Sequence, residues 1–402
     1  MIDFSSVPMT RQLTLRTVMR TVLDRGPISR AELARLTGLS KQTMSEVFRE
    51  LEEGGWLEVT GHTKGAVGRS AAMYEVRADR ALVFGADVGG TKIQAALADM
   101  QGTIVAEAVE PTDPAGGGAV LAQIAALAVR LAGEAGLGIE RVLVGTVGIP
   151  GAYNARTREL TMVPNIEGLE GPDFAGRLTG EVGFEMLVGN DVNMGAKGEQ
   201  WLGEGRNVDS FVFIALGTGI GMGVINERQI IRGARGAAGE IATLPVGANP
   251  FDGRTFKSGA LESTIGSAGI SGHYAGLTGR TGVSVREIMD SVATDPFAAA
   301  TVDEVGRTLA AAILAVSAVV DPERVILGGS IGARPELLAR VAHYLPLCMP
   351  VAPVCTISTL GSRASLLGTI ATSLDRLREN LFELSAYDPA RAAAVRAVEA
   401  AR

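Results

Sequence analysis

The apolar positions of the first eighty residues repeat at the spacing of short helices. Over residues 11–25 they form one stripe, made of Leu15, Val18, Met19, Val22 and Leu23. A stripe with this period predicts an amphipathic helix. Gly26 and Pro27 follow it directly and are typical residues for ending a helix.

Two more helices are expected after this stop. Ser29 and Glu32 form a capping-box pattern that opens a short helix over residues 30–37. Gly38 suits the left-handed turn at its C-terminus. Ser40 is a good cap for a helix over residues 41–55, whose inward stripe is Met44, Val47, Phe48 and Leu51.

A helix, a tight glycine turn and a second helix form the helix-turn-helix arrangement. The second helix of that motif enters the major groove of DNA, and its N-terminal residues meet base edges. Glutamine suits an adenine edge, and lysine suits a guanine or a phosphate. The candidate DNA contacts are Ser40, Lys41, Gln42, Thr43, Ser45 and Arg49.

A wing is predicted behind this motif. Residues 56–60 and 73–77 alternate like two short strands, and a glycine-rich loop lies between them. Lys64 and Arg69 in that loop are candidate contacts to the sugar-phosphate backbone. The same parts also fit a helical protein-docking domain whose charged face has no DNA target.

After Asp79 the pattern changes to buried-strand runs joined by glycine turns. Two successive β-rich halves, each with helices, predict a duplicated α/β fold with a cleft between the halves. The expected strands cover residues 81–88, 93–99, 103–109, 142–151, 185–190, 210–225 and 324–330, and the expected helices cover about 117–135, 191–201 and 302–320.

Three glycine turns carry candidate chemistry for phosphate and nucleotide binding. Backbone N–H groups in such turns approach phosphate oxygens without obstruction by a Cβ atom. Asp87 is a candidate for holding Mg²⁺. The other candidates are Gly89, Gly90, Thr91 and Lys92 in the first turn, Gly217, Thr218 and Gly219 in the second, and Gly329 in the third. Each turn also fits a purely structural role.

Asp191 follows a buried strand and opens a helix. A carboxylate in that place can accept the proton of a sugar hydroxyl that attacks a phosphoryl group. It can equally serve as a simple helix N-cap. The local sequence leaves both interpretations open.

Composition narrows the class of protein. Hydrophobic residues make up 47% of the 402 and charged residues 20%, which favours a globular chain over a disordered one. Residues 1–80 carry a net charge of +2 and the rest −9, so a slightly basic head precedes an acidic body. The N-terminus lacks the apolar core of a signal peptide, no apolar run approaches membrane-spanning length, and Cys348 and Cys355 are the only cysteines. We expect a cytoplasmic protein.

Taken together, the motifs resemble the ROK family (repressor, open reading frame, kinase), and its repressor branch in particular. "DVGGTK" at 87–92 is similar to the family's phosphate loop, and "VGIPG" at 147–151 to one of its turns. The resemblance implies a winged helix-turn-helix followed by an actin-like, ribonuclease-H-like body of the sugar-kinase type. It also implies that a sugar is bound by Asn165, Asn190, Asp191, Glu240 and Glu262, with Asp191 as general base in the kinases.

Two departures from the family pattern bear on metals. The family's "GEIGH" motif ends in a histidine, whereas Thr243 stands at that position here. The family's cysteine cluster is absent, and Ala260 falls where its last cysteine would be. A zinc site needs about four N, S or O ligands. We therefore expect no zinc site, a loop ordered by local packing, and no required cofactor.

The expected domains are a winged helix-turn-helix over 1–79, a first lobe over 80–190 that a C-terminal helix completes, a second lobe with an oligomerisation surface over 191–375, and a helical tail over 376–402. The expected function is a sugar-responsive transcriptional regulator of carbohydrate metabolism. It would be a repressor that binds a palindromic operator as a homo-oligomer, most simply a dimer. The alternative is an ATP-dependent sugar kinase, or a dual protein, and only then would ATP and Mg²⁺ be needed.

Overall fold

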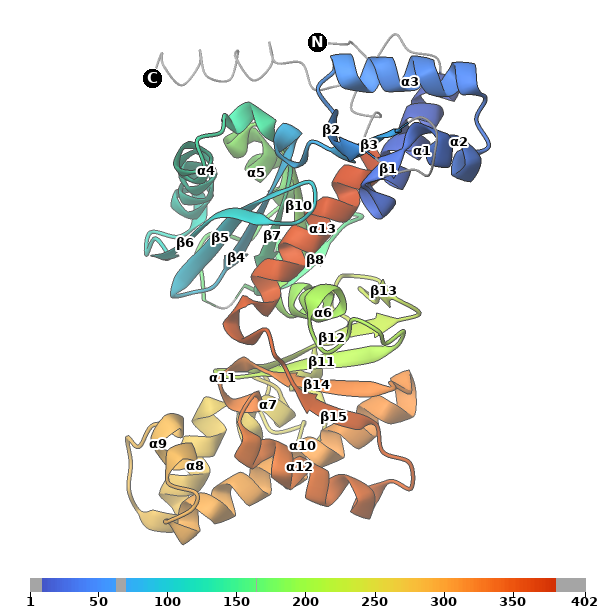
Figure 1. Ribbon diagram of the computed structural model, residues 1–402. Coiled ribbons are helices and arrows are strands. Elements are labelled where there is room, and N and C mark those ends of the chain that lie inside the picture. The colour runs from blue at the N-terminus through green and yellow to red at the C-terminus, as the bar shows by residue number, and fades with distance from the viewer. Residues whose placement is uncertain (1–8, 63–69, 164, 381–402) are drawn as a thin grey trace.

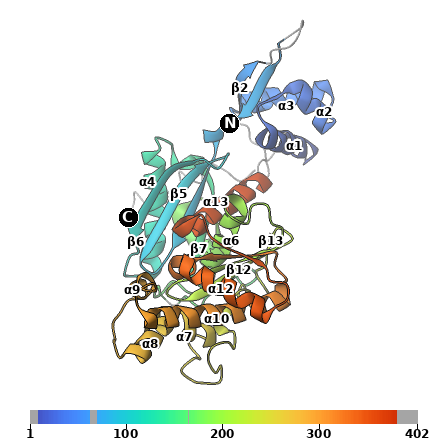
Figure 2. The same ribbon diagram turned by 60° about the horizontal axis from the view of Figure 1, so that its bottom comes forward.

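The computed structural model describes residues 9–62, 70–163 and 165–380, which form a small head on a two-lobed body (Figure 1). Head and second lobe lie at opposite ends of the molecule in both views (Figures 1 and 2). The expected fold class is therefore confirmed: a winged helix-turn-helix precedes an α/β body with two mixed sheets.

The head contains the three expected helices, α1 (Met9–Arg25), α2 (Arg30–Thr37) and α3 (Lys41–Glu53). Its caps are those that the sequence predicted. The Ser29 hydroxyl accepts from the Glu32 N–H at 3.2 Å, Gly38 has a φ of 70°, and the Ser40 hydroxyl accepts from the Thr43 N–H at 3.1 Å. Glu32 does not complete the capping box, because its carboxylate binds Arg35 instead.

The wing is a sheet of three strands in the order β1 (Ile28–Ser29), β3 (Ala72–Val76) and β2 (Leu57–His62). The sequence predicted the two longer strands but not the two-residue strand β1. Lys64 and Arg69, the candidate wing contacts, lie outside the described residues.

The first lobe is built on a sheet with the order β10-β7-β4-β5-β6. Its strands are β4 (Leu82–Val88), β5 (Lys92–Asp99), β6 (Ile104–Pro111), β7 (Val142–Ile149) and β10 (Glu185–Asn190). β4 forms an antiparallel meander with β5 and β6, and runs parallel to β7 on its other side. A small hairpin, β8 (Ala152–Asn154) with β9 (Glu159–Thr161), and α5 (Phe174–Val182) were not predicted.

Helix α4 (Gly117–Glu134) covers this sheet by contacting β5 and β6. Within the described ranges it is the one helix whose length and composition would also allow it to cross a membrane, with a mean hydropathy of 1.2. Val120, Ile124, Leu127 and Leu131 are instead buried in the core of the lobe. A core helix passes the same test, so this property carries no further conclusion.

The second lobe repeats the topology of the first. Its sheet has the order β13-β12-β11-β14-β15, so in both sheets the first strand is central, a meander lies on one side and two parallel strands on the other. The strands are β11 (Phe211–Leu216), β12 (Ile220–Asn226), β13 (Gln229–Ile230), β14 (Arg324–Gly328) and β15 (Val354–Ile357). The helices are α7 (Ala260–Ile265), α8 (Ser267–Thr278), α9 (Val285–Asp290), α10 (Pro296–Val320), α11 (Gly329–Gly332) and α12 (Pro335–Cys348).

Two helices lie between the sheets and join the lobes. Helix α13 (Ala364–Asn380) contacts β4, β7 and β5 of the first sheet, and α6 (Asp191–Leu202) contacts β11 and β12 of the second. The two helices contact each other closely through glycines. A Cβ atom at Gly198 would overlap the Ala364 carbonyl, and one at Gly368 would overlap the Met194 carbonyl.

Head and body share one hydrophobic cluster. It contains side chains of all three head helices and of the wing, and continues into the body. The body contributes Ala81, Val83, Ala96, Ala98 and Met100 from the first lobe and Leu366, Ile370, Leu374 and Leu377 from α13. The connection between head and body is therefore packed rather than a free linker.

The close approach of α6 and α13 gives a stability prediction. Gly368→Ala should lower the free energy of unfolding by about 1–3 kcal/mol, the usual cost of overpacking a tight contact. The measurement is urea denaturation followed by circular dichroism. Gly272→Ala in α8 is the matched control, because nothing lies within 4 Å of a Cβ built there. That control should be neutral or gain up to about 1 kcal/mol from helix propensity. Equal shifts for the two variants would contradict the packing argument.

Candidate functional site

The candidate site residues lie at the ends of strands that occupy equivalent positions in the sheets of the two lobes. The first glycine turn joins β4 to β5, and the second joins β11 to β12, so the two turns occupy equivalent places in the duplicated sheets. Asn190 ends β10 and Asp191 follows it, and Gly329 follows β14. In open α/β sheets, ligands bind outside the carboxyl ends of the strands.

The first turn is closed by backbone bonds and leaves its polar side chains outside. The Gly89 N–H donates to the Lys92 carbonyl at 2.9 Å, and the Thr112 hydroxyl donates to the Gly89 carbonyl at 2.5 Å. Gly90 has no room for a side chain, since a Cβ there would lie 2.7 Å from the Asn165 Cβ. The turn thus contacts the loop of Asn165, while Thr91 and Lys92 are exposed.

The second turn is held by the helices beside it. The Gly217 N–H donates to the Gly219 carbonyl at 2.9 Å, and the Ser267 hydroxyl at the start of α8 donates to the Gly217 carbonyl at 2.9 Å. Glu262 on α7 accepts from the Ile220 N–H at 3.0 Å. Thr218 at the tip of the turn is exposed.

The third turn needs its glycine for conformational reasons. Gly329 has a φ of 80°, and a Cβ atom there would overlap the Leu216 carbonyl. Its neighbour Ser330 lies against the second turn, 3.3 Å from a Cβ built on Gly217. The second and third glycine turns, which both belong to the second lobe, are therefore in contact.

Asp87, at the end of β4, is held by the helix between the lobes. The Ser365 hydroxyl of α13 donates to Asp87 Oδ1 at 2.7 Å. Burial raises the pKa of Asp87 to about 6, and the charge of Asp191 adds to the shift, whereas the Ser365 bond opposes it. A carboxylate in this place accepts hydrogen bonds or takes part in binding a cation.

Asp191 is not the cap of α6. Asn190 caps the helix, because its Oδ1 accepts from the Asn193 N–H at 3.0 Å. Asp191 is the first helical residue, and its Oδ1 accepts from the adjacent Val192 N–H at 2.9 Å. Burial raises the pKa of Asp191. Because Asn190 caps the helix, Asp191 Oδ2 makes no hydrogen bond to another residue of the described chain and can act as a hydrogen-bond acceptor or base.

Asn190 is also tied to the first lobe. Its Nδ2 donates to the Gly151 carbonyl at 3.1 Å. Both ends of this amide are thus engaged in local structure, which fixes the junction of β10 and α6. A ligand could still use the second lone pair of Oδ1 and the second hydrogen of Nδ2.

Four acidic side chains form a row whose charges act on one another in sequence. The charge of Asp191 raises the pKa of Asp87, and the charges of Asp191 and Glu262 raise the pKa of Glu240. Burial is the main cause of the raised pKa of Glu240. We call Asp87, Asp191, Glu240 and Glu262 the carboxylate row. It brings together one residue of the phosphate turn and three of the expected sugar contacts, from both lobes.

The loop where the family's cysteine cluster would lie is ordered by a buried threonine. The Thr255 hydroxyl, 8% exposed, lies at 3.0 Å from the Asn249 carbonyl and 2.8 Å from the Asp252 carbonyl. The Gly259 N–H then donates to the Thr255 carbonyl at 2.7 Å. Thr243 donates its hydroxyl to the Glu240 carbonyl at 3.0 Å. In the described part of the chain, no three His, Cys, Asp or Glu side chains gather in a way that could hold a metal ion.

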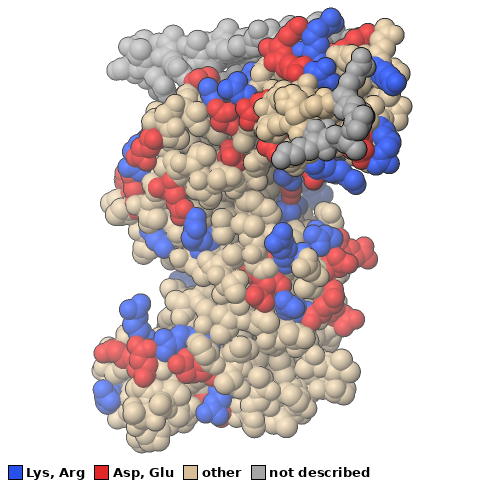
Figure 3. Space-filling view, in the orientation of Figure 1, with Lys and Arg blue, Asp and Glu red and all other residues tan. Residues whose placement is uncertain are grey.

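On the head, α3 turns its candidate DNA contacts outward. Lys41, Gln42, Ser45 and Arg49 are exposed, while the apolar stripe of the helix is buried. The Gln42 amide donates to the Glu46 carboxylate at 3.2 Å. It would have to give up this hydrogen bond in order to contact a DNA base. Ser40 and Thr43 are engaged in the cap. Acidic and basic side chains lie next to one another over the head on the face shown in Figure 3.

Sequence reasoning missed two residues that hold the cleft together. Ser365 binds Asp87 from 278 positions away, and Gly151 binds Asn190 through its backbone carbonyl. Neither has a local signal. A serine at the start of a helix and a glycine after a strand are common, and only the fold brings them to these partners.

A winged helix-turn-helix joined to a duplicated, two-lobed body with glycine turns and the carboxylate row defines a sugar-kinase-like protein that carries a DNA-binding head. Residues 83–375 match the ROK family, and residues 17–70 match the MarR family. Because the first match covers more than half of the chain, this chain belongs to the ROK family.

Relatives of both kinds known in the family are similar to it. The xylose repressor of Caldicellulosiruptor bescii is 27% identical over 235 residues, which is 58% of this chain and 58% of the repressor. The glucokinase of Halalkalibacterium halodurans is 30% identical over 308 residues, 71% of this chain and 92% of the kinase. The crystal structure of a ROK family transcriptional regulator, a homologue of the Escherichia coli MLC protein, superposes with a TM-score of 0.77 at 21% identity, covering 94% of this chain and 99% of that one.

The raised pKa of Asp87 gives a prediction about pH. A carboxyl whose pKa is about 6 in the folded state and 3.8 ordinarily binds more protons when folded, so its contribution to stability is lost as pH rises from about 4 to about 6. Asp87→Asn should remove this loss. On going from pH 4.5 to pH 7, the free energy of unfolding of the variant should rise by about 1–3 kcal/mol relative to that of the natural protein. Urea denaturation at both pH values measures this change.

Asp209→Asn removes one negative charge from a side chain that is 73% exposed and serves as the control. It should leave the pH dependence of stability unchanged. The same pH slope in the Asp87 variant and in the natural protein would contradict the burial of this carboxyl.

Proposed function

We propose that the protein is a sugar-responsive transcriptional regulator, and specifically a repressor, that binds operator DNA through α3 and a sugar in the cleft between the lobes. One observation carries the proposal: an exposed recognition helix and a carboxylate-lined cleft belong to a single packed unit. The hydrophobic cluster shared by the head and α13 joins the two sites. The similarity to xylose repressors supports the same function.

The cleft favours an uncharged, hydroxyl-rich ligand. Sugar hydroxyls both donate and accept, and the carboxylates of the row are acceptors. The row also disfavours anions, because neighbouring carboxylates already raise the pKa of Asp87 and of Glu240. A neutral sugar or an amino sugar therefore suits this cleft better than a sugar phosphate. Asn165 and Asn190 would add amide contacts.

Helix α13 offers a route from cleft to head. Ser365 in its first turn binds Asp87 in the cleft, and Leu377 near its end belongs to the cluster shared with the head. Its 17 residues span about 25 Å. A sugar that draws the lobes together would shift this helix relative to the head. The ligand biases the two arrangements only by its differential affinity for them, typically ~1–3 kcal/mol.

The proposal includes the state in which the protein acts. As a cytoplasmic homodimer it would place two copies of α3 in successive major grooves of a palindromic operator, about 34 Å apart. The body would need no zinc, since Thr255 and its partners order the loop that the family's cysteines would otherwise hold.

An ATP-dependent sugar kinase, alone or combined with regulation, is the second candidate. It is favoured by the position of Asp191, which is free of the capping role and faces the same cleft as Asp87. Thr91, Lys92 and Thr218 remain exposed in their glycine turns and would contact the phosphates of ATP, with Asp87 binding Mg²⁺ directly or through water.

The regulator function predicts specific DNA binding by α3. Fluorescence anisotropy of the full chain with the DNA upstream of its own gene, at about 150 mM salt and with competitor DNA, should show tight binding that one sugar of a panel changes. Lys41→Ala combined with Arg49→Ala should weaken binding at least about 30-fold, because each lost contact removes roughly 1–3 kcal/mol.

Arg20→Ala is the control for that double variant. Arg20 is 77% exposed on α1, outside the recognition helix, and should be tolerated. Specific binding that survives the double variant would refute the role of α3. No specific DNA binding under any sugar would favour the kinase, or a protein-docking head without a DNA target.

Asp191→Ala separates sensing from catalysis. In a sensor, this variant should lose sugar affinity about 10-fold or more, by removal of a buried hydrogen bond to a charged group, as measured by calorimetry. In a kinase it should also lose on the order of 10²–10⁴ in turnover, measured by ADP release with sugar and ATP. Unchanged affinity and unchanged turnover would show that the site is elsewhere.

A further inference from the structure

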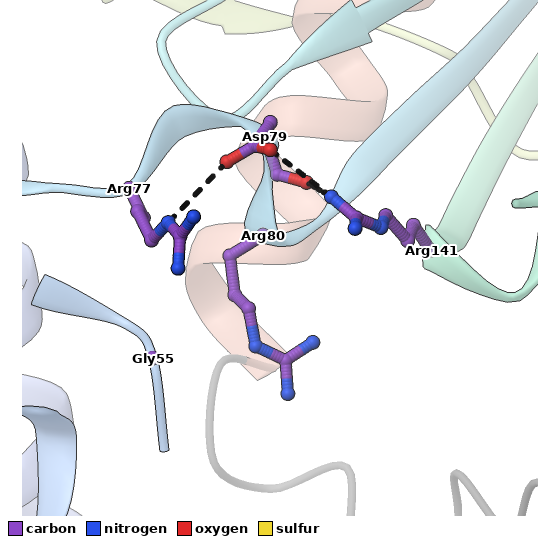
Figure 4. A pocket seen from close by; sticks show the side chains of 5 residues that line it. All are labelled: Gly55, Arg77, Asp79, Arg80 and Arg141. Atoms are coloured by element: carbon purple, nitrogen blue, oxygen red, sulfur yellow. Dashed lines mark hydrogen bonds and ion pairs between the residues drawn. The ribbon is translucent and has the colours of Figure 1, made fainter. Parts of the chain in front are cut away.

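A pocket lies where the head joins the body, away from the sugar cleft (Figure 4). It has a volume of about 250 Å³ and is lined by Gly55, Arg77, Asp79, Arg80 and Arg141. Gly55 belongs to the turn after α3, and Arg77 to Arg80 form the connection between head and body, which includes the short helix η2 (Ala78–Arg80). Arg141 precedes β7 of the first lobe. We call this the junction pocket.

The lining of the junction pocket is strongly basic. Three arginines and one aspartate line it, so the lining carries a net charge of +2. Arg141 Nη1 donates to the Asp79 carbonyl at 2.9 Å and to Asp79 Oδ2 at 3.1 Å, and Arg77 Nε lies 3.8 Å from Asp79 Oδ1. These ion pairs are partly open to solvent, with 52% of the Arg77 side chain and 38% of the Arg141 side chain exposed.

The side chain of Arg80 is held in position by residues of the head and not by a carboxylate. Its Nε donates to the Gly54 carbonyl at 3.1 Å, and its guanidinium lies 4.7 Å from the centre of the Trp56 ring. Figure 4 shows this guanidinium pointing away from Asp79. Among the described residues no carboxylate pairs with Arg80, so the lining holds more guanidinium groups than Asp79 alone can neutralise.

We propose that the junction pocket binds a small anion of the phosphate class with two or three negative charges, such as pyrophosphate or the phosphate group of a small ester. Guanidinium groups pair with phosphate oxygens through two parallel hydrogen bonds. The net charge of the lining matches a dianion. The volume lies below the about 300–1,000 Å³ of pockets that take drug-sized ligands, which limits the ligand to a small one. The carboxylate row makes the sugar cleft less favourable for the same ligand.

A bound anion would fasten the head to the body. Arg80 is positioned by Gly54 and Trp56 of the head, whereas Arg141 belongs to the first lobe. An anion held between them requires one orientation of head against body, and would compete with Asp79 for Arg77 and Arg141. The anion binding itself does not rest on the proposed regulatory function; only its effect on DNA binding does.

DNA is a less suitable occupant of the pocket. The base-reading residues lie at the N-terminus of α3, and the pocket lies beyond its C-terminus. The 13 residues of the helix separate them by about 20 Å. A duplex placed against the N-terminus of α3 is therefore not expected to reach into the pocket.

Isothermal titration calorimetry of the full chain with inorganic pyrophosphate, at fixed ionic strength, tests the proposal. We expect one site per chain. Arg141→Gln should weaken binding at least about 10-fold, which corresponds to about 1.4 kcal/mol. Asp79→Asn should tighten it, because the competing carboxylate is gone while the three arginines remain. A gain in affinity cannot come from a damaged fold, so this variant keeps the test valid if Arg141→Gln is unstable.

Two control variants locate the bound anion. Arg130→Gln alters a surface arginine that pairs with Glu110 elsewhere on the first lobe and should change nothing. Lys92→Gln removes the cation of the first glycine turn and should also leave pyrophosphate affinity unchanged. Loss of binding in Lys92→Gln together with normal binding in Arg141→Gln would place the anion in the cleft and overturn the proposal.

Other results also overturn it. No heat of binding, or affinities unchanged in both Arg141→Gln and Asp79→Asn, would mean that the junction pocket holds no such anion. If pyrophosphate does not bind, but Arg141→Gln weakens operator binding and reduces its salt dependence, the arginines contact the DNA backbone instead. If pyrophosphate binds as expected and the protein proves to have no DNA target, the proposed function fails while the anion site stands.

Discussion

The architecture depends on the contact between α6 and α13. Each helix belongs to the core of a different lobe, and their backbones approach so closely that Gly198 and Gly368 leave no space for a methyl group. The cleft follows from this contact, because α6 begins with Asn190 and Asp191 and α13 begins beside Ser365 and Asp87. The same two helices that hold the lobes together therefore place the first half of the carboxylate row. Any change in the angle between the lobes has to be accommodated at this one packed contact.

Electrostatics divides the molecule into two regions with opposite preferences. The cleft gathers carboxylates from both lobes and buries them far enough to raise the pKa of Asp87, Asp191 and Glu240. The junction with the head gathers arginines around Asp79. These regions are connected by α13 and by the shared hydrophobic cluster. If both proposed sites are occupied as proposed, a ligand that suits one region is unsuited to the other.

Much of this could be predicted from the sequence where local rules decide the outcome. Ser29, Gly38 and Ser40 cap and end the head helices as expected, because capping depends only on neighbouring residues. The alternating and apolar runs located the long strands and the long helix α10 for the same reason. The two-residue strand β1, the six-residue helices α7 and α9 and the hairpin of β8 and β9 were missed, since each is too short to show a period. The 12-residue helix α8 was missed because it buries only Ile270 and Tyr274 and so shows no apolar stripe. Prediction of the candidate site had a similar limit. The sequence allowed Asp191 to be either a helix cap or a base, and only the structure showed that Asn190 is the cap. The bond between Ser365 and Asp87 joins residues 278 positions apart, which no local pattern reveals.

The hydrophobic cluster shared by head and body has a consequence for how such proteins evolve. The glucokinase relative matches over 308 residues and thus shares mainly the body. A descendant of the present chain that lost its head would leave Ala81, Met100 and Leu377 uncovered, since they are buried beside head residues here. It would need polar replacements along β4, β5 and α13 before it could remain soluble. Gain or loss of the head is thus a transition in several steps, in which the surface of the body and the presence of the DNA-binding domain must change together.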